Sequence, residues 1–190
     1  MSNEPRKVLI LQGSPRKNGN TALLASRLAE SARLTGAQVE SLYIHGMDIK
    51  PCQACWKCQD PAAKGCVIQD DMQQVFPKLI EADAWVIATP VHWFNMTAQT
   101  KLWMDRCFAL ARYGKRPFKK NIGILIAFGD SDAFRSGAVN AIRCFQDSFN
   151  YVGATIAGIV YASATKAGEI GENAEVLAEA ERLGKKLAEM

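Results

Sequence analysis

Short apolar runs alternate along the chain with segments in which apolar residues recur at helical spacing. The first run, residues 7–12, is nearly continuous and ends at a glycine, which is typical of a strand buried on both faces of a sheet. Similar runs predict strands over residues 39–44, 84–88, 122–128 and 155–161. The segments between and after them predict helices over residues 23–34, from 70 onwards, over 97–112 and 137–151, and from 172 to the C-terminus.

This alternation predicts a single α/β domain that spans residues 1–190, because no repeat, linker or low-complexity tract interrupts the series. We expect a three-layer, doubly wound fold in which a sheet of five parallel strands, in the order 2-1-3-4-5, carries helices on both faces. In such sheets ligands bind beyond the carboxyl ends of the strands. The loops that follow the strands are therefore the candidate sites.

Composition and charge exclude several classes of protein. The formal net charge of +4 is small and spread along the chain, which indicates neither a nucleic-acid-binding stripe nor a polybasic membrane anchor. No apolar run reaches the roughly 20 residues that a membrane span needs, and the first residues lack the apolar core of a signal peptide. We therefore expect a cytoplasmic protein without nucleic-acid or membrane partners, in a compartment that keeps thiols reduced.

The loop after the first predicted strand, GSPRKNGNT over residues 13–21, leads directly into a helix whose first N–H groups lack partners. Its hydroxyl, amide and guanidinium groups suit a phosphate dianion. The candidate residues are Ser14, Arg16, Asn18, Gly19, Asn20 and Thr21. The loop lacks the ending of a P-loop and the glycine spacing of a dinucleotide motif, which disfavours ATP and NAD as resident ligands. The alternative is an ordinary polar turn with helix-capping residues.

The loops after the third and fourth predicted strands end at the same edge of the sheet. The third-strand loop offers two aromatic side chains that could cover a flat ring, with peptide groups and an amide for its polar rim. The candidate residues there are Pro90, Val91, His92, Trp93, Phe94 and Asn95, and in the fourth-strand loop Gly129 and Asp130. The alternatives are a core role for the aromatic side chains and an ordinary loop role for the histidine.

Four cysteines gather in the segment 51–69 with the spacing C-x2-C-x2-C-x7-C; they are Cys52, Cys55, Cys58 and Cys66. Four thiolates suit a [4Fe–4S] cluster, although the last interval and Val67 depart from the bacterial ferredoxin motif. A structural Zn²⁺ ion and reduced thiols without metal are the alternatives. Because the segment follows the second strand, we expect it at the same sheet edge as the candidate ligand site, with a short path for electrons between them.

Three segments, GSPRKNGNT, CVIQDDM and TPVHWFNMTAQTKLWMDR, resemble the NADPH-dependent FMN reductase and iron–sulfur flavoprotein family of flavodoxin-like proteins. The resemblance covers nearly the whole chain, and the cysteine spacing is similar to that of iron–sulfur flavoproteins. It implies that the loop 14–21 holds the phosphate of FMN and the loop 90–95 its isoalloxazine ring. It also implies a homodimer or homotetramer with the flavin near a subunit boundary. The stretch GDSDAFRSG departs from the glycine-rich loop of many relatives.

The function that we expect is an FMN-dependent oxidoreductase in which the flavin carries the chemistry and no protein side chain is an essential acid or base. Electrons would pass from NAD(P)H or a reduced carrier such as ferredoxin to a small acceptor such as a flavin or quinone. The alternatives are an electron carrier without a substrate of its own and a flavin-binding regulatory protein. The basic segment 112–120 could attract the extra phosphate of NADPH or could be a solvated loop.

Overall fold

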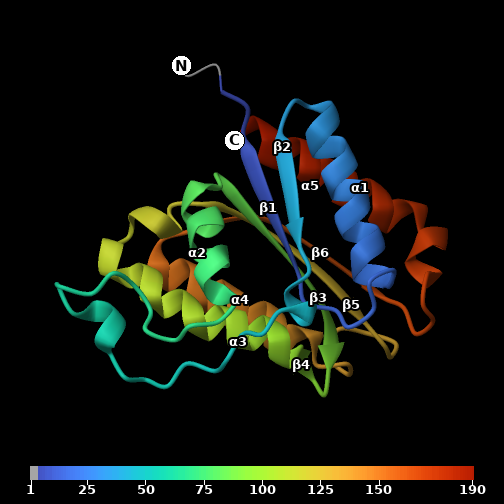
Figure 1. The fold of residues 1–190 in the computed structure, drawn as a ribbon. Coiled ribbons are helices and arrows are strands. Elements are labelled where there is room, and N and C mark those ends of the chain that lie inside the picture. The colour runs from blue at the N-terminus through green and yellow to red at the C-terminus, as the bar shows by residue number, and fades with distance from the viewer. Residues whose placement is uncertain (1–3) are drawn as a thin grey trace.

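A computed structural model describes residues 4–190, which form one sheet with helices on both faces (Figure 1). The parallel strands are β1 (Lys7–Gln12), β2 (Gln38–Leu42), β3 (Ala84–His92), β5 (Asn121–Phe128) and β6 (Thr155–Ser163), in the spatial order β2-β1-β3-β5-β6. A two-residue strand, β4 (Asn95–Met96), pairs antiparallel with the end of β3. The α-helices are α1 (Asn20–Leu34), α2 (Met72–Glu81), α3 (Ala98–Arg106), α4 (Ala138–Val152) and α5 (Ala174–Glu189).

The predicted fold class is confirmed, because the five predicted parallel strands lie side by side in the predicted order. The prediction missed β4, so the full numbering of the sheet reads 2-1-3-5-6. It also ended the third strand at residue 88, whereas β3 runs on to His92. Pairing with β5 up to Pro90 and with β4 beyond it extends the strand past its apolar run.

Two further boundaries differ from the prediction. The second strand ends at Leu42, and Ile44 instead begins a turn of 3₁₀-helix. The helix predicted over residues 97–112 ends at Arg106 and continues as a 3₁₀-helix over Cys107–Tyr113. In both places the apolar pattern continues beyond the element, because the next turn is also packed against the core.

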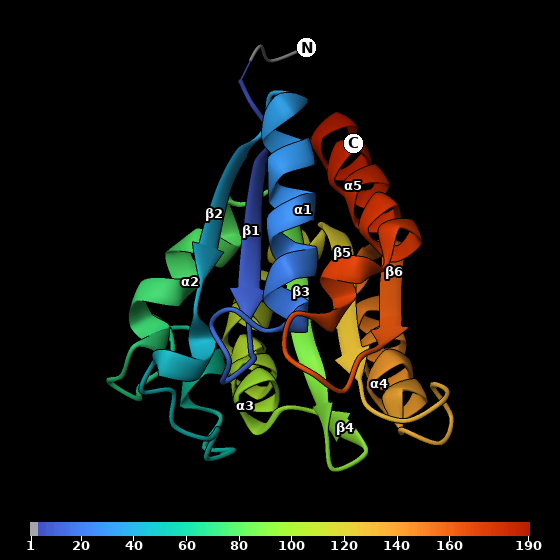
Figure 2. The ribbon, with the colours of Figure 1, turned by 90° about the vertical axis from the view of Figure 1, so that its right-hand side faces the viewer.

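The two faces of the sheet carry different helices, as Figures 1 and 2 show. Alternate residues of β1 illustrate the division, since Leu9 belongs to the core layer that includes residues of α2, α3 and α4, whereas Val8 belongs to the layer that includes residues of α1 and α5. The first layer contains large aromatic side chains, including Trp85 and Phe145, and the second is built mainly from alanine, valine and leucine. No helix within residues 4–190 combines the length and apolar character needed to cross a membrane.

Candidate active site

A cleft of about 380 Å³ opens at the carboxyl edge of the sheet, where the segments after β1, β5 and β6 meet the outer end of β3. Figure 2 shows the ribbon of these segments at the lower end of the strands. Nine of the predicted site residues line it: Ser14, Arg16, Gly19, Asn20, Thr21, Pro90, Val91, His92 and Gly129. The cleft falls within the size range of small-molecule sites, roughly 300–1,000 Å³. The predicted convergence of loops from separate strands is thus present in the structure.

The start of helix α1 forms the polar end of the cleft. Gly19 is the N-cap residue in an extended conformation, and no side chain caps the helix. Ser14 and Thr21 are buried at its base, with 6% and 2% of their surface exposed, while Arg16 is exposed at the rim. Uncapped N–H groups, two hydroxyls and a guanidinium group are a donor set that suits a phosphate dianion.

Two residues of this loop are used differently from the prediction. The side-chain amide of Asn20 donates to the carbonyl of Lys166 at 2.8 Å and accepts from the N–H of Ile170 at 3.2 Å. It therefore ties α1 to the segment after β6, while Asn20 also lines the cleft. Asn18 does not line this cleft but lies on a separate groove together with Lys17 and Arg33.

A buried group of threonines joins the loop after β1 to the start of α3. The hydroxyl of Thr97 donates to the carbonyl of Gly13 at 2.8 Å, and its N–H donates to the hydroxyl of Thr89 at 3.1 Å. A β-carbon on Gly13 would lie 2.0 Å from the hydroxyl oxygen of Thr100. Only glycine fits there, so the two loops that form the cleft hold each other in place.

The end of β3 and strand β4 form a hairpin whose turn is Trp93 and Phe94. Both turn residues are left-handed, with φ of 47° and 65°, a conformation that bulky side chains rarely adopt. Trp93 is 92% exposed and Phe94 54% exposed, and neither lines the cleft. The side-chain oxygen of Asn95 accepts from the N–H of Met96 at 2.8 Å, so Asn95 supports the turn. The cleft wall comes from Pro90, Val91 and His92 instead.

The segments after β5 and β6 complete the cleft. Gly129 lines it as predicted, whereas Asp130 lies outside the lining with its own backbone at φ 90°. The hydrogen bond from the N–H of Ser131 lowers the pKa of Asp130, helped by the nearby charge of Arg135. The candidate residues did not include Pro15, which lies within the predicted phosphate loop, or the other lining residues Ala127, Phe128, Ala164 and Thr165. The topology contained the signal for Thr165, because it follows β6 as the phosphate loop follows β1.

The four cysteines predicted to bind a metal differ widely in exposure. Cys52 and Cys55 are exposed, Cys58 is buried and Cys66 is half-buried. Within residues 4–190 no three histidine, cysteine or acidic side chains gather as a metal-binding group. In this structure the four thiols are therefore not gathered around one point. The segment leaves the carboxyl edge of the sheet as expected, because β2 is parallel to β1, but none of its cysteines lines the cleft.

The position of the cysteine segment follows from its packing on the far end of α3. The ring of Trp56 meets that of Phe108 at 5.2 Å in an edge-on contact, and the amide of Gln59 donates to the carbonyl of Phe108 at 3.0 Å. Phe108 lies just beyond α3, whose other end follows Thr97 beside the loop after β1. The segment therefore follows the β2 side of the molecule, below β2 in Figure 2.

A buried ion pair anchors the end of this segment. The guanidinium of Arg106 donates to both carboxylate oxygens of Asp70, at 2.5 and 3.1 Å, and both side chains have 1% or less of their surface exposed. Burial alone would raise the pKa of Asp70, but the hydrogen bonds from Arg106 and from the N–H of Lys50 lower it below its usual value. Burial alone would lower the pKa of Arg106, but Asp70 and the nearby Cys66 thiol raise it. Both partners therefore stay charged.

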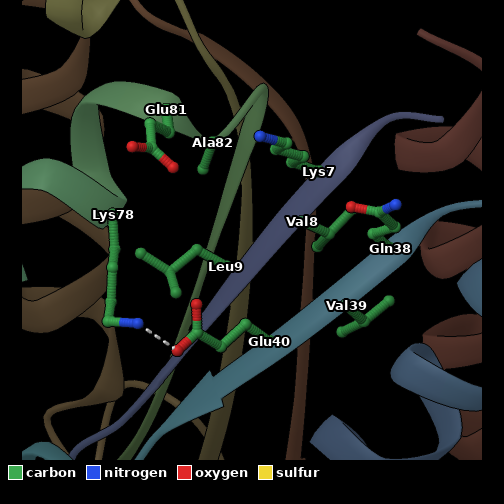
Figure 3. Close-up of a pocket in the computed structure, with 9 residues that line it drawn as sticks. All are labelled: Lys7, Val8, Leu9, Gln38, Val39, Glu40, Lys78, Glu81 and Ala82. Atoms are coloured by element: carbon green, nitrogen blue, oxygen red, sulfur yellow. Dashed lines mark hydrogen bonds and ion pairs between the residues drawn. The ribbon is translucent and has the colours of Figure 1, made fainter. Parts of the chain in front are cut away.

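A second hollow, of about 310 Å³, lies at the opposite end of the strands, between α2 and the starts of β1 and β2 (Figure 3). The ammonium of Lys78 and the carboxylate of Glu40 point toward each other across it, 2.6 Å apart. These charged groups are already paired, and parallel sheets bind ligands at the other edge. The cleft at the carboxyl edge is the candidate active site.

The geometry of this cleft fits a flat heterocycle that carries a terminal phosphate. The phosphate would lie at the start of α1, and the ring would lie along the peptide groups and side chains of residues 90–92. FMN has these two parts, and the donor set of the first loop fits its phosphate. The site offers no comparable arrangement of side chains for direct acid–base catalysis, because it is formed mainly by loop backbone, hydroxyls and small side chains.

Comparison with known proteins gives a consistent picture. The sequence pattern of a family described as NADPH-dependent FMN reductase matches residues 6–169. A protein from Methanosarcina thermophila named iron-sulfur flavoprotein is 30% identical over 152 residues, which cover 80% of this chain and 77% of that protein. A protein of the same name from Archaeoglobus fulgidus is 31% identical over 189 residues, covering 96% of this chain and 79% of that protein.

Among solved structures, the NAD(P)H:quinone oxidoreductase from Methanothermobacter marburgensis superposes with a TM-score of 0.76. The two chains are 20% identical, and the match covers 97% of this chain and 96% of the other. At this identity the likeness concerns the fold, which is the flavodoxin-like arrangement of a parallel sheet between two layers of helices.

Proposed function

The chain belongs to the NADPH-dependent FMN reductase family and is an oxidoreductase, and we propose that it binds FMN in the cleft at the carboxyl edge of its sheet. Electrons would pass from NAD(P)H through the bound flavin to a small acceptor such as a free flavin or a quinone. FMN, when bound, would supply the redox chemistry, since flavins exchange electrons both in pairs and singly. The protein would bind, orient and shield it.

The observation that carries this proposal is the uncapped start of α1 inside the cleft. An N-terminus without a side-chain cap leaves N–H groups that need an acceptor, and a phosphate supplies it. Ser14 and Thr21 lie at the base of this site, and Arg16 can approach from the rim. We assign these residues to the phosphate and Val91 and His92 to the ring.

Titration of the apoprotein with FMN and with riboflavin tests this assignment. Arg16→Ala removes a charged hydrogen bond to the phosphate, so FMN binding should weaken by roughly 10- to 100-fold while riboflavin binding stays unchanged. Arg33→Ala is the matched control, because Arg33 lies at the far end of α1 and bonds to the carbonyl of Val39. A wild-type protein that takes up no FMN at micromolar levels would overturn the proposal.

Turnover assays separate the reductase from the alternatives. Steady-state oxidation of NADPH and NADH should be measured with free flavin and with quinones as acceptors. Turnover with FMN-loaded protein supports a reductase. Flavin binding without pyridine-nucleotide oxidation would favour an electron carrier or a flavin-binding regulatory protein instead.

The names of the two archaeal relatives support a second version of this function, in which the four cysteines hold a [4Fe–4S] cluster and a carrier such as ferredoxin is the partner. The exposure of Cys52 and Cys55 supports the version without a cluster, because the segment would have to refold around the metal. Iron and sulfide analysis after anaerobic purification distinguishes them. About four of each per chain are expected for a cluster, and none after reconstitution would exclude it.

We further propose that the protein is a homo-oligomer with its cleft near a subunit boundary. The support is the exposure of two aromatic side chains on segments that continue from the cleft lining, Trp93 at 92% after His92 and Phe134 at 81% in the loop after β5, since exposed aromatic side chains are typical of interfaces. Light scattering should give a multiple of the 20.8 kDa chain mass. The double variant Trp93→Ala/Phe134→Ala should shift the distribution toward the monomer.

A further inference from the structure

The turn of the β3–β4 hairpin has a conformation that its own sequence does not favour. A two-residue turn with both residues left-handed is usually formed by asparagine and glycine, and here it is formed by Trp93 and Phe94. Bulky residues in this region cost free energy and persist only where the surroundings hold them. The side chains of these two residues are exposed, so the restraint must act on the backbone of the turn.

The first turn of α4 supplies that restraint. The side-chain amide of Asn140 donates to the carbonyl of Phe94 at 3.0 Å. Gly137, the N-cap residue of α4, lies directly against the same backbone, since a β-carbon on it would be 2.6 Å from the Cα of Phe94. Gly137 also has φ of 78°, which favours glycine. The hairpin tip and the start of α4 therefore touch backbone to backbone, with one hydrogen bond fixing their alignment.

This contact lies outside the cleft, yet it determines one of the cleft's walls. Neither Gly137 nor Asn140 lines the cleft, whereas Val91 and His92, which pair with β4, do. The other end of the hairpin is fixed separately, through the hydrogen bond from Thr97 to Gly13. The wall formed by residues 91–92 is thus held at its base by the threonine group and at its tip by α4.

We propose that Asn140 is a positioning residue for the flavin ring. It holds the hairpin tip so that Val91 and His92 keep the place that the ring requires, and this inference rests on the proposed function. The phosphate end has its own supports, in the Thr97–Gly13 bond and the bond from the hydroxyl of Tyr43 to the carbonyl of Pro15. Loss of the Asn140 contact should therefore affect the ring and leave the phosphate interaction intact.

The test uses the full chain carrying Asn140→Ala. Binding of both FMN and riboflavin should weaken equally, by about three- to tenfold, as expected for one lost hydrogen bond. The ratio of the two dissociation constants should stay at the wild-type value, and the flavin midpoint potential should shift. Arg143→Ala is the matched control, because Arg143 is exposed one turn further along α4 and pairs with Asp147. It should change none of these quantities.

Asn140→Asp separates positioning from general stability. Asn140 is the third residue of α4, where a negative charge is favourable, so this variant should keep the wild-type melting temperature. A carboxylate cannot donate to the carbonyl of Phe94, and binding of both flavins should weaken at least as much as in Asn140→Ala. In the apoprotein of either variant, amide hydrogen exchange at residues 93–96 should accelerate.

The outcomes separate the two proposals. Variants that fold, bind both flavins within twofold of the wild type and leave exchange at residues 93–96 unchanged would overturn the role of Asn140, while FMN binding by the wild type would still support the proposed function. A changed ratio of the FMN and riboflavin constants would also overturn it, because the effect would then concern the phosphate. If the wild type binds no flavin, both proposals fail.

Discussion

The loops after β1 and β2 leave the same edge of the sheet, yet they are organised in different ways. The loop after β1 is short and is anchored on both sides, by the N–H of Gly13 on the carbonyl of Ala88 at 2.9 Å and by the hydroxyl of Thr97 on the carbonyl of Gly13 at 2.8 Å. The segment after β2, residues 43–71, is long, and its cysteines range from exposed to buried. Its last residues are held by the buried pair of Asp70 and Arg106.

This difference shows how loop length decides what fixes a site. In the short loop, the adjoining strand and helix determine most of the backbone, so the donor groups for an anion are formed in advance. In the long segment, a few contacts that lie far apart determine the path of the backbone. Two non-glycine residues there, Ala54 and Trp56, have the left-handed conformation, with φ of 49° and 57°. The loop after β1 is thus already arranged to bind an anion. The segment after β2 would have to rearrange to bring its four thiols together.

The largest expected effect concerns the anchor of the cysteine segment. Asp70→Ala leaves the buried guanidinium of Arg106 without its partner and should lower the free energy of unfolding by about 3–5 kcal/mol. Urea denaturation measures it. Glu40→Ala, which removes a partly exposed ion pair with Lys78, is the control and should cost less than about 1 kcal/mol. An equal loss of unfolding free energy in the two variants would mean that the buried ion pair stabilises the fold no more than the exposed one.

The second prediction concerns the anchor of the phosphate loop. Gly13→Ala places a methyl group where the hydroxyl of Thr100 lies, so we expect a loss of about 1–3 kcal/mol in unfolding free energy. FMN binding should weaken by at least roughly tenfold, because the loop must shift. Gly171→Ala is the control, since its new β-carbon would meet only Leu23, at 3.8 Å. Unchanged flavin binding in Gly13→Ala would show that the loop is less constrained than its contacts indicate.

The third prediction uses acid to weaken the anchor of the cysteine segment. The pKa of Asp70 is lower in the folded protein than its usual value, mainly because the hydrogen bonds from Arg106 and Lys50 outweigh the effect of burial. The pair therefore contributes stability above about pH 4, and this contribution is lost as the pH falls further. Urea midpoints at pH 6 and pH 3 measure the decline, which should be shallower in Asp70→Asn. Parallel declines in the two proteins would contradict the assignment.

The smallest expected effects concern the thiols themselves. In metal-free protein, Cys58→Ala should cost about 1 kcal/mol because Cys58 is buried, and Cys52→Ala should stay within about 0.5 kcal/mol because it is exposed. Reaction with a disulfide reagent should modify Cys52 and Cys55 first and Cys107 last, since burial raises the pKa of the Cys107 thiol. If instead both alanine substitutions made protein purified with iron lose its iron and its stability together, the thiols would act as one metal-bound unit.

Much of the architecture could be predicted from local patterns. The continuous apolar run of β1 predicts a strand buried on both faces, and the glycine and polar residues after it predict a loop before a helix. Strict alternation of strands and helices leaves few topologies, which is why the strand order was predictable. The phosphate loop followed from the same reasoning, because its residues are neighbours in the chain and lie at a defined place in the topology.

Other features depend on contacts between distant segments. Nothing near Asn140 in the sequence indicates that its side-chain amide meets the carbonyl of Phe94. Asn20, a candidate for binding the anion, has a further contact that its place in the loop does not reveal, because its side-chain amide also binds the segment after β6. The local sequence could not reveal these two hydrogen bonds, because each joins a side-chain amide to a backbone carbonyl more than 45 residues away in the chain.

The sequence by itself determined the fold class, the order of the parallel strands and the loop that can receive a phosphate. These features follow from hydrophobic periodicity and from short-range chain geometry, which the order of residues encodes directly. Only the tertiary structure decided where the cysteine segment lies, which side chains line the cleft and what holds the hairpin turn in its left-handed conformation. Those features depend on packing between elements far apart in the chain. One buried ion pair or one side-chain amide there fixes a backbone conformation that the local sequence does not determine.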